Sequence, residues 1–247
     1  MKELLRHSVL ICLAAGLPGM ACAQSLTGNV GSANITSGDR AAEVRLGADD
    51  TGLVQGRLHF EQAFTGWYQL RAIAAFRKPD EGDWDYSGLT LENWFQWAEE
   101  GKDQQGFNGG LRLAYTRSDG GDADEVAARL TLTDRFADRW EWRANIIAGA
   151  DISSSSPGGI DFESRFQLTR AVPMEALGTD KWRFGGELFS EFGNSADILP
   201  IDEQAHQVGP VVKAEWSNGV YLQAAVRTGL TEGSDDLMGK IFIGREF

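Results

Sequence analysis

Two histidines, His59 and His206, have surroundings that could support acid–base chemistry. His59 lies between Arg57 and Glu61, and His206 follows the acidic pair Asp202-Glu203. A histidine beside a carboxylate can act as a general acid or base. The spacing of two residues around His59 is also that of neighbours on one face of a strand, and no serine motif accompanies His206. We therefore expect no catalytic residue and no enzyme, and keep a hydrolase as the third hypothesis.

Other chemistry finds less support in the sequence. The chain has no phosphate-binding glycine loop, no set of metal ligands at metal-site spacing and no nucleophile elbow. Both cysteines, Cys12 and Cys22, lie near the start, and the formal net charge is −13. Nucleic acids require a basic surface, so this charge excludes them as a partner class. We expect no metal and no cofactor.

A larger set of charged residues recurs at alternate positions along the chain. Opposite charges attract strongly where water is scarce, so these side chains could either line a polar passage and set its selectivity or pair and close it. We give the two alternatives equal weight. The set comprises Arg57, Glu61, Arg71, Arg112, Arg129, Arg143, Arg165, Arg183, Glu187 and Arg227.

The elements that must position these residues are strands. Twelve segments alternate between an apolar face and a face with charges of both signs, the pattern of a strand between two different environments. Each is near the ~9–11 residues that a tilted membrane strand requires. The segments are 41–48, 53–64, 67–76, 89–98, 107–116, 124–133, 140–150, 160–171, 182–192, 206–216, 220–230 and 238–247.

The connections decide which way the apolar faces point. In a soluble barrel they point inward, and in a membrane barrel they point outward to lipid. The tightest turns, 65–66 and 217–219, fall on one side, whereas the long acidic loops mostly fall on the other, as membrane barrels prefer. We therefore predict an all-β protein, a closed antiparallel up-and-down transmembrane β-barrel of about twelve strands over residues 41–247. Ten strands would also be tolerable, and the connection 172–181 is longer than a periplasmic turn should be.

The residues before the barrel divide into two parts. Residues 1–23 have basic residues, an apolar stretch and Ala21-Cys22-Ala23, which predicts a signal peptide cleaved before Gln24. A lipidated Cys22 is the alternative. Residues 24–40 are polar and rich in Gly, Ser and Asn, which predicts a flexible periplasmic segment. Their composition leaves open whether they enter the barrel.

Aromatic residues cluster beside the tight turns. Amphipathic rings favour the boundary between lipid headgroups and hydrocarbon, so the pattern predicts an aromatic girdle. Its predicted periplasmic members are Phe64, Trp67, Tyr68, Trp97, Phe136, Trp140, Trp182, Trp216, Tyr221 and Phe247.

The chain ends inside a strand pattern, with Ile241, Ile243 and Phe247 on its apolar face. A closed barrel has no free edge, so this strand should pair with the first. The ending resembles that of bacterial outer-membrane β-barrel proteins, which finish on an aromatic residue. The resemblance implies that Phe247, Ile243 and Ile241 form the recognition signal for the barrel-assembly machinery. It also implies the outer membrane of a Gram-negative bacterium, with lipid and lipopolysaccharide around the barrel.

A narrower resemblance covers the last two hairpins. Gly209-Pro210, Gly229-Leu230-Thr231, Ser234-Asp235-Asp236 and Phe247 are similar to the end of small transporter-like barrels of the phenol-degradation meta-pathway family. That resemblance implies passage of small solutes. We therefore expect a narrow passive channel, or transporter, for small solutes. A non-conducting structural or surface-interaction barrel is the alternative.

Overall fold

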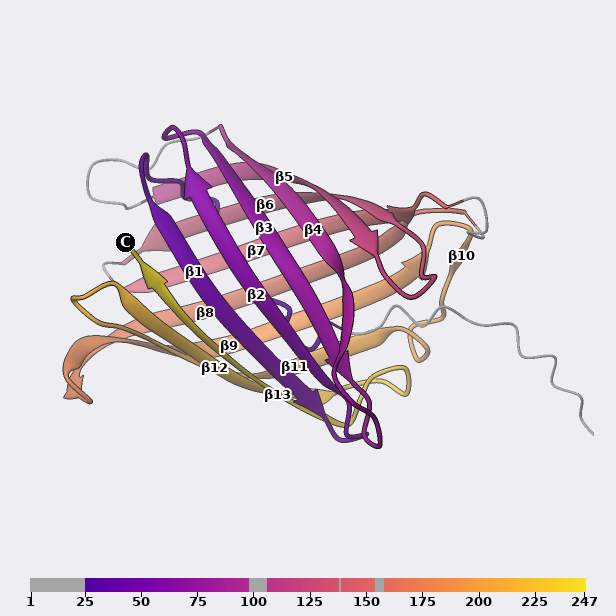
Figure 1. Cartoon of the computed structure of the whole chain (residues 1–247). Helices are drawn as coiled ribbons and strands as arrows, with labels where there is room; N and C mark the ends of the chain where they lie inside the picture. The colour runs from indigo at the N-terminus through magenta and orange to yellow at the C-terminus, as the bar shows by residue number, and fades with distance from the viewer. Residues whose placement is uncertain (1–24, 98–105, 138, 154–157) are drawn as a thin grey trace, which may run out of the picture.

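The computed structural model describes residues 25–97, 106–137, 139–153 and 158–247, and within them the chain is all strand, turn and loop (Figure 1). The predicted signal peptide, residues 1–23, lies outside these residues. None of the described residues belongs to a helix long and apolar enough to cross a membrane. The strands are β1 (Arg40–Asp49), β2 (Val54–Ala63), β3 (Tyr68–Lys78), β4 (Asp85–Gln96), β5 (Gly106–Ser118), β6 (Glu125–Phe136), β7 (Trp140–Asp151), β8 (Asp161–Ala176), β9 (Thr179–Asn194), β10 (Asp197–Ile198), β11 (Ala205–Glu215), β12 (Val220–Gly229) and β13 (Leu237–Glu246).

The sheet closes on itself. β13 pairs with β1 in antiparallel register from Ala41↔Glu246 to Asp49↔Met238, so the last strand joins the first as predicted. β10 has two residues and pairs only with β9, which leaves twelve strands in the wall. The closed twelve-stranded barrel is confirmed.

The two faces of the wall have opposite chemistry. On β2, Leu58 is 50% exposed on the outside, whereas the neighbouring His59 is 6% exposed on the inside. Val44 and Leu46 of β1 likewise point outward, while Glu43 and Arg45 are buried inside. A polar interior and an apolar exterior reverse the arrangement of a soluble barrel. The wall is therefore built to face lipid.

The β8–β9 hairpin differs from the sequence prediction. We expected a loop over 172–181, but the strands continue to Ala176 and Thr179, which pair with each other. Leu177 and Gly178 form the turn with φ of +53° and +77°. Positive φ at both central residues is the type I′ geometry, which suits the twist of a two-residue hairpin. The hairpin extends from the end of the barrel where the C-terminus lies, which we call the periplasmic end (Figure 1).

Exposed aromatic residues gather at that end. Phe64, Trp67 and Trp97 are each more than half exposed. Trp182 lies on the same face of β9 as the exposed Phe184, on which it stacks with ring centroids 6.0 Å apart, and its indole donates a hydrogen bond to the Thr179 carbonyl. One predicted member does not belong to the girdle. Tyr221 lies on the inward face, since its strand β12 places it in register with Glu215 and Gly244.

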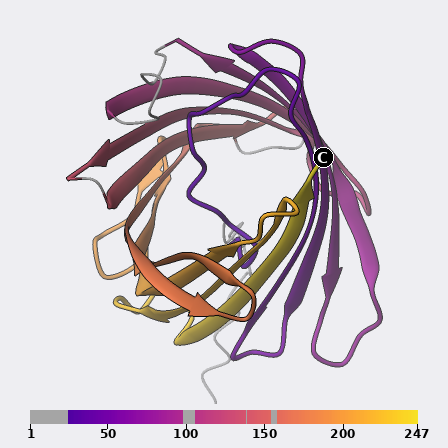
Figure 2. The same cartoon turned by 90° about the vertical axis from the view of Figure 1, so that its left-hand side faces the viewer.

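The residues before β1 enter the barrel. Residues 25–39, which we call the lumen segment, cross the interior as an irregular chain (Figure 2). The sequence predicted a flexible periplasmic segment over residues 24–40, whereas residues 25–39 lie inside the barrel. Composition identifies a segment that cannot form a core of its own, but it does not reveal that polar groups elsewhere in the chain bind its backbone.

Candidate functional site in the barrel lumen

The lumen segment is held by hydrogen bonds to the inner wall. Asn145 of β7 binds both backbone groups of Gly31: the Gly31 N–H donates to Oδ1 at 2.8 Å, and Nδ2 donates to the Gly31 carbonyl at 3.1 Å. The Ala33 N–H donates to the Thr133 hydroxyl at 3.1 Å, and the Ile35 N–H donates to the Gln96 side chain at 2.6 Å. The wall thus supplies the partners that a strand neighbour would otherwise supply.

Cationic side chains bind the carbonyl oxygens of the same segment. Lys240 Nζ donates to the Gly28 carbonyl at 2.8 Å, and Arg112 Nη2 donates to the Ser32 carbonyl at 2.7 Å. Longer contacts of 3.4–3.5 Å join Arg227 to Ser25, Arg45 to Thr27 and Arg165 to Asn29. Five cations from five strands therefore bind one extended backbone.

The side chains of the segment fill the space between these bonds. Leu26, Thr27 and Val30 are at most 1% exposed. Ile35 packs in a small apolar cluster with Ala63 and Trp94. A cavity between the segment and strands β4–β6 has a volume of about 10 Å³, room for one water molecule at most. The segment therefore occludes this part of the lumen.

Gly47 on β1 marks the closest approach of the segment to the wall. A Cβ at this position would meet the Leu26 carbonyl oxygen at 2.5 Å and its carbon at 2.7 Å. Both atoms are backbone, so they cannot move without displacing the segment. Only glycine fits here.

Ion pairs connect the inward-facing side chains of the wall around the segment. The Glu187 carboxylate forms ion pairs with Lys240 at 2.5 Å and with Arg227 at 3.7 Å, with all three side chains at most 2% exposed. Arg71 binds Glu61 and lies 3.5 Å from Glu92. The other inward-facing pairs are Arg45–Glu43, Arg135–Glu141, Arg143–Glu141 and Arg165–Glu163.

The ten charged residues predicted for the lumen all lie on the inward faces of their strands, in the register set by the strand pairs. Six of them form ion pairs with carboxylates or cations of the wall: Glu61, Arg71, Arg143, Arg165, Glu187 and Arg227. Arg183 instead donates to the Thr169 hydroxyl at 3.1 Å. Arg112 binds the lumen segment. The role of these residues in selectivity stays a prediction.

The sequence analysis missed three aromatic residues of the interior. Trp94 lies under two guanidinium groups, with Arg112 at 3.2 Å and Arg71 at 4.2 Å from the ring centroid. Phe189 faces Arg227 at 3.8 Å, and Phe242 faces Arg45 at 4.6 Å. Large rings on this wall were expected to face lipid. The signal was nevertheless present, because each ring stands two positions from an inward charge: Glu92, Glu187 and Lys240.

Neither histidine is set up for nucleophilic chemistry. Both ring nitrogens of His59 are buried without a hydrogen-bond partner. His206 Nε2 lies 3.1 Å from Gln204 Oε1, and the Ser234 hydroxyl donates to the His206 backbone carbonyl and not to the ring. A histidine that activates a serine must reach its hydroxyl. In the part of the chain that the structure describes, no group of acidic, His and Cys side chains could hold a metal ion.

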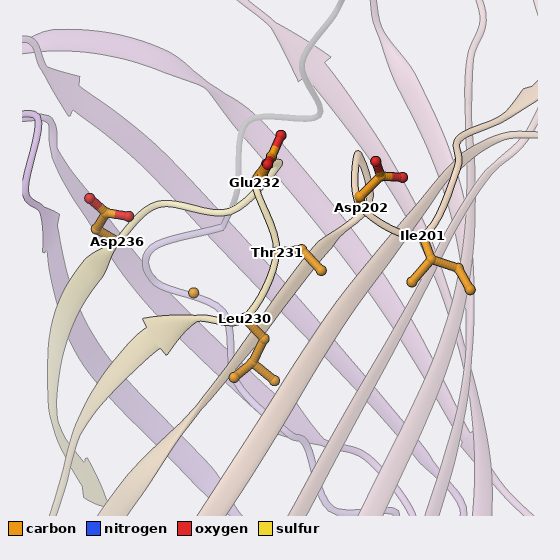
Figure 3. A pocket seen from close by; sticks show the side chains of 7 residues that line it. Ile201, Asp202, Leu230, Thr231, Glu232 and Asp236 are labelled. Carbon is orange, nitrogen blue, oxygen red and sulfur yellow. The ribbon is translucent and has the colours of Figure 1, made fainter.

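The outer end carries an open acidic pocket of about 650 Å³ (Figure 3). It lies between the connection that precedes β11 and the connection from β12 to β13. Its floor and sides combine the apolar Ile201 and Leu230 with the carboxylates of Asp202, Glu232 and Asp236. Just beside it, burial and the neighbouring carboxylates of Asp49 and Asp50 raise the pKa of Asp235 above its ordinary range. The outer mouth is therefore negative, whereas the cations lie deeper inside.

A closed barrel with a polar interior and an apolar outer wall is a transmembrane β-barrel of the outer-membrane type, and its surroundings are membrane lipid. Solved structures agree on the fold. An outer membrane channel of the COG4313 group from Pseudomonas putida F1 has a TM-score of 0.63 at 13% identity, over 86% of this chain and 97% of that one. The KdgM porin has a TM-score of 0.57 at 10% identity, over 84% of this chain and 99% of that one. The NanC porin has a TM-score of 0.54 at 12% identity, over 83% and 98% of the two chains.

Comparisons at the level of sequence find no relative. No protein-family model matches the chain, and no curated protein matches it. The narrower resemblance to the phenol-degradation meta-pathway family is therefore not confirmed.

Proposed function

We propose that the protein is a narrow passive channel for small solutes in the outer membrane, and that the lumen segment closes it. The observation that carries the proposal is the segment itself. It enters the barrel as an irregular chain held by side-chain hydrogen bonds, not as a strand of the wall, so it can leave without breaking any strand pair. A barrel with a purely structural role would not need an interior segment that can leave the lumen.

Two further observations support this function. The structures with the same fold that reach a TM-score above 0.5 include an outer membrane channel and two porins. The likeness of residues 209–247 to the meta-pathway barrels also points to passage of small solutes. The buried ion pairs favour the second candidate, a non-conducting structural barrel, because they would hold the wall rigid with or without the segment.

A reversible disulfide tests the proposal. The hydroxyl oxygens of Ser32 and Thr133 are 3.5 Å apart, so cysteines at these positions should bond and fix the segment to β6. Both native cysteines lie within residues 1–23, so protein refolded from residues 24–247 alone has no other thiol. We expect Ser32→Cys/Thr133→Cys to give no single-channel current in a planar bilayer when oxidised, and stepwise openings when reduced.

A matched control separates closure from the effect of a disulfide as such. Thr90 and Thr116 face each other on β4 and β5, with hydroxyl oxygens 2.9 Å apart. Thr90→Cys/Thr116→Cys should conduct equally in both redox states, because it joins two wall strands and leaves the segment free. Silence of every form, reduced or oxidised, from protein shown to be folded would instead establish the non-conducting barrel.

A further inference from the structure

Three arginines in the middle of the lumen have no carboxylate partner. Among the residues that the structure describes, Arg57, Arg112 and Arg129 form no ion pair. The surrounding cations Arg45, Arg71, Arg165, Arg227 and Lys240 all do. Arg112 donates to the Ser32 carbonyl, whereas the Nε of Arg129 is buried without a hydrogen-bond partner among the described residues.

Both arginines face the lumen, as His59 does. Arg57 stands in register with Arg45, and Arg129 stands in register with Arg112, so both lie on the inward face. His59 is two positions from Arg57 on the same face of β2 and is 6% exposed. The buried Nε of Arg129 and both ring nitrogens of His59 have no partner.

Two of the three carboxylates whose charges act on Arg57 or Arg129 are already bound. Glu92 and Glu163 act on Arg129. Glu92 lies 3.5 Å from Arg71 and accepts from the Trp94 indole at 3.1 Å, and Glu163 accepts from Arg165 at 2.7 Å. Glu125 acts on Arg57 from the outer end of β6, together with Glu92. None of the three carboxylates contacts Arg57 or Arg129.

Withdrawing a cation from bulk water without a partner is costly, and an anion of complementary geometry offsets that cost. The rest of this wall already shows the preference for oxygen acceptors, because five cations bind carbonyl oxygens of the lumen segment. Guanidinium groups match carboxylate and phosphate oxygens in particular.

We propose that Arg57, Arg129 and His59 form a site for the oxyanion group of a small solute, a carboxylate or a phosphate, and that the channel therefore selects anions. The inference rests on the proposed channel function and names the class of solute. The acidic outer mouth does not contradict it, because selectivity is set where the passage is narrowest and least hydrated.

The test is the reversal potential of the reduced Ser32→Cys/Thr133→Cys channel in a KCl gradient, and block of its chloride current by inorganic phosphate. We expect chloride to be preferred over potassium and phosphate to block. Adding Arg57→Gln/Arg129→Gln should lower the preference by about threefold for each charge removed and weaken the block. Arg57→Lys/Arg129→Lys keeps the charges and should keep the preference for chloride.

Arg77→Gln is the matched control. It also removes one arginine, but this side chain is half exposed at the outer end and pairs with Asp122, so selectivity should not change. A channel that prefers potassium, or a glutamine variant with unchanged selectivity, would overturn the anion site and leave the channel proposal intact. If no form conducts, calorimetric titration of the folded protein with phosphate decides the site: binding lost in the glutamine variant supports it, and no binding overturns it.

Discussion

Glu187 is the residue on which the most deeply buried cluster of ion pairs depends. It neutralises Lys240 and Arg227, and it also accepts a hydrogen bond from Gln167 at 3.2 Å. Lys240 in turn holds the Gly28 carbonyl. One carboxylate on β9 is therefore linked, through Lys240, both to the closing strand β13 and to the lumen segment.

Changing Glu187→Gln should destabilise the barrel. The substitution keeps the shape but leaves two buried cations without a counter-charge, a loss of about 3–5 kcal/mol in the free energy of unfolding. Urea unfolding of the protein refolded in phospholipid vesicles measures it. Glu215→Gln is the control, because its ion pair with Lys181 is exposed and should contribute less than about 1 kcal/mol. Equal losses in the two variants would contradict a central role for Glu187.

At the scale of the element, the strands could be predicted from the sequence, but the position of the lumen segment could not. Alternation of apolar and charged residues gave all twelve wall strands, with errors of a few residues at their ends. The largest error was at β8 and β9, where Met174 and Glu175 resembled loop but continue the strand. Pairing partners, not local preference, decide such positions.

The contacts inside the barrel likewise could not be predicted from local sequence patterns. The alternation of residues between the two faces of each strand predicted that the ten charged residues face inward. The ion pairs between Arg71 and Glu61 and between Lys240 and Glu187 depend on strand register, which a single sequence does not show. The lumen segment has no periodicity at all, so no pattern in its own residues could place it.

The turn between β8 and β9 offers a test at this scale. Leu177 adopts φ of +53° and is 80% exposed, a conformation that costs a branched residue about 1–2 kcal/mol and that asparagine tolerates better. Leu177→Asn should therefore stabilise the hairpin by about 1 kcal/mol, measured as a higher urea midpoint. Leu230→Asn, at an exposed leucine in an outer loop without positive φ, should not. A midpoint raised equally by both would mean that loss of an exposed apolar side chain, not backbone strain, is responsible.

At the scale of the molecule, the pairing of β1 with β13, which we call the seam, closes the sheet into a barrel. Ile241 and Ile243 are exposed on its lipid face, and the Phe247 N–H donates to the Arg40 carbonyl at 2.9 Å. The proposed assembly signal therefore also lies on the strand that closes the sheet.

Phe247→Ala should slow assembly more than it weakens the finished barrel, because the ring is 63% exposed and packs little once the seam is formed. Membrane-inserted, heat-modifiable protein in cells, followed in time, measures assembly, and urea unfolding of refolded protein measures stability. Phe64→Ala is the control: its ring is 58% exposed at the same end, on β2–β3. If both variants assemble at the same rate, the terminal residue is no signal.

The lumen segment also bears on the order in which the molecule folds. The seam joins strands from opposite ends of the chain, and pairings of such long sequence separation form late because loop-closure entropy opposes them. The segment is continuous with β1, so it can reach the inner side of the sheet before β1 and β13 pair. It can act there as an internal template: Lys240 and Gly28, one on the last strand and one ahead of the first, would draw the two free edges together before their backbones meet.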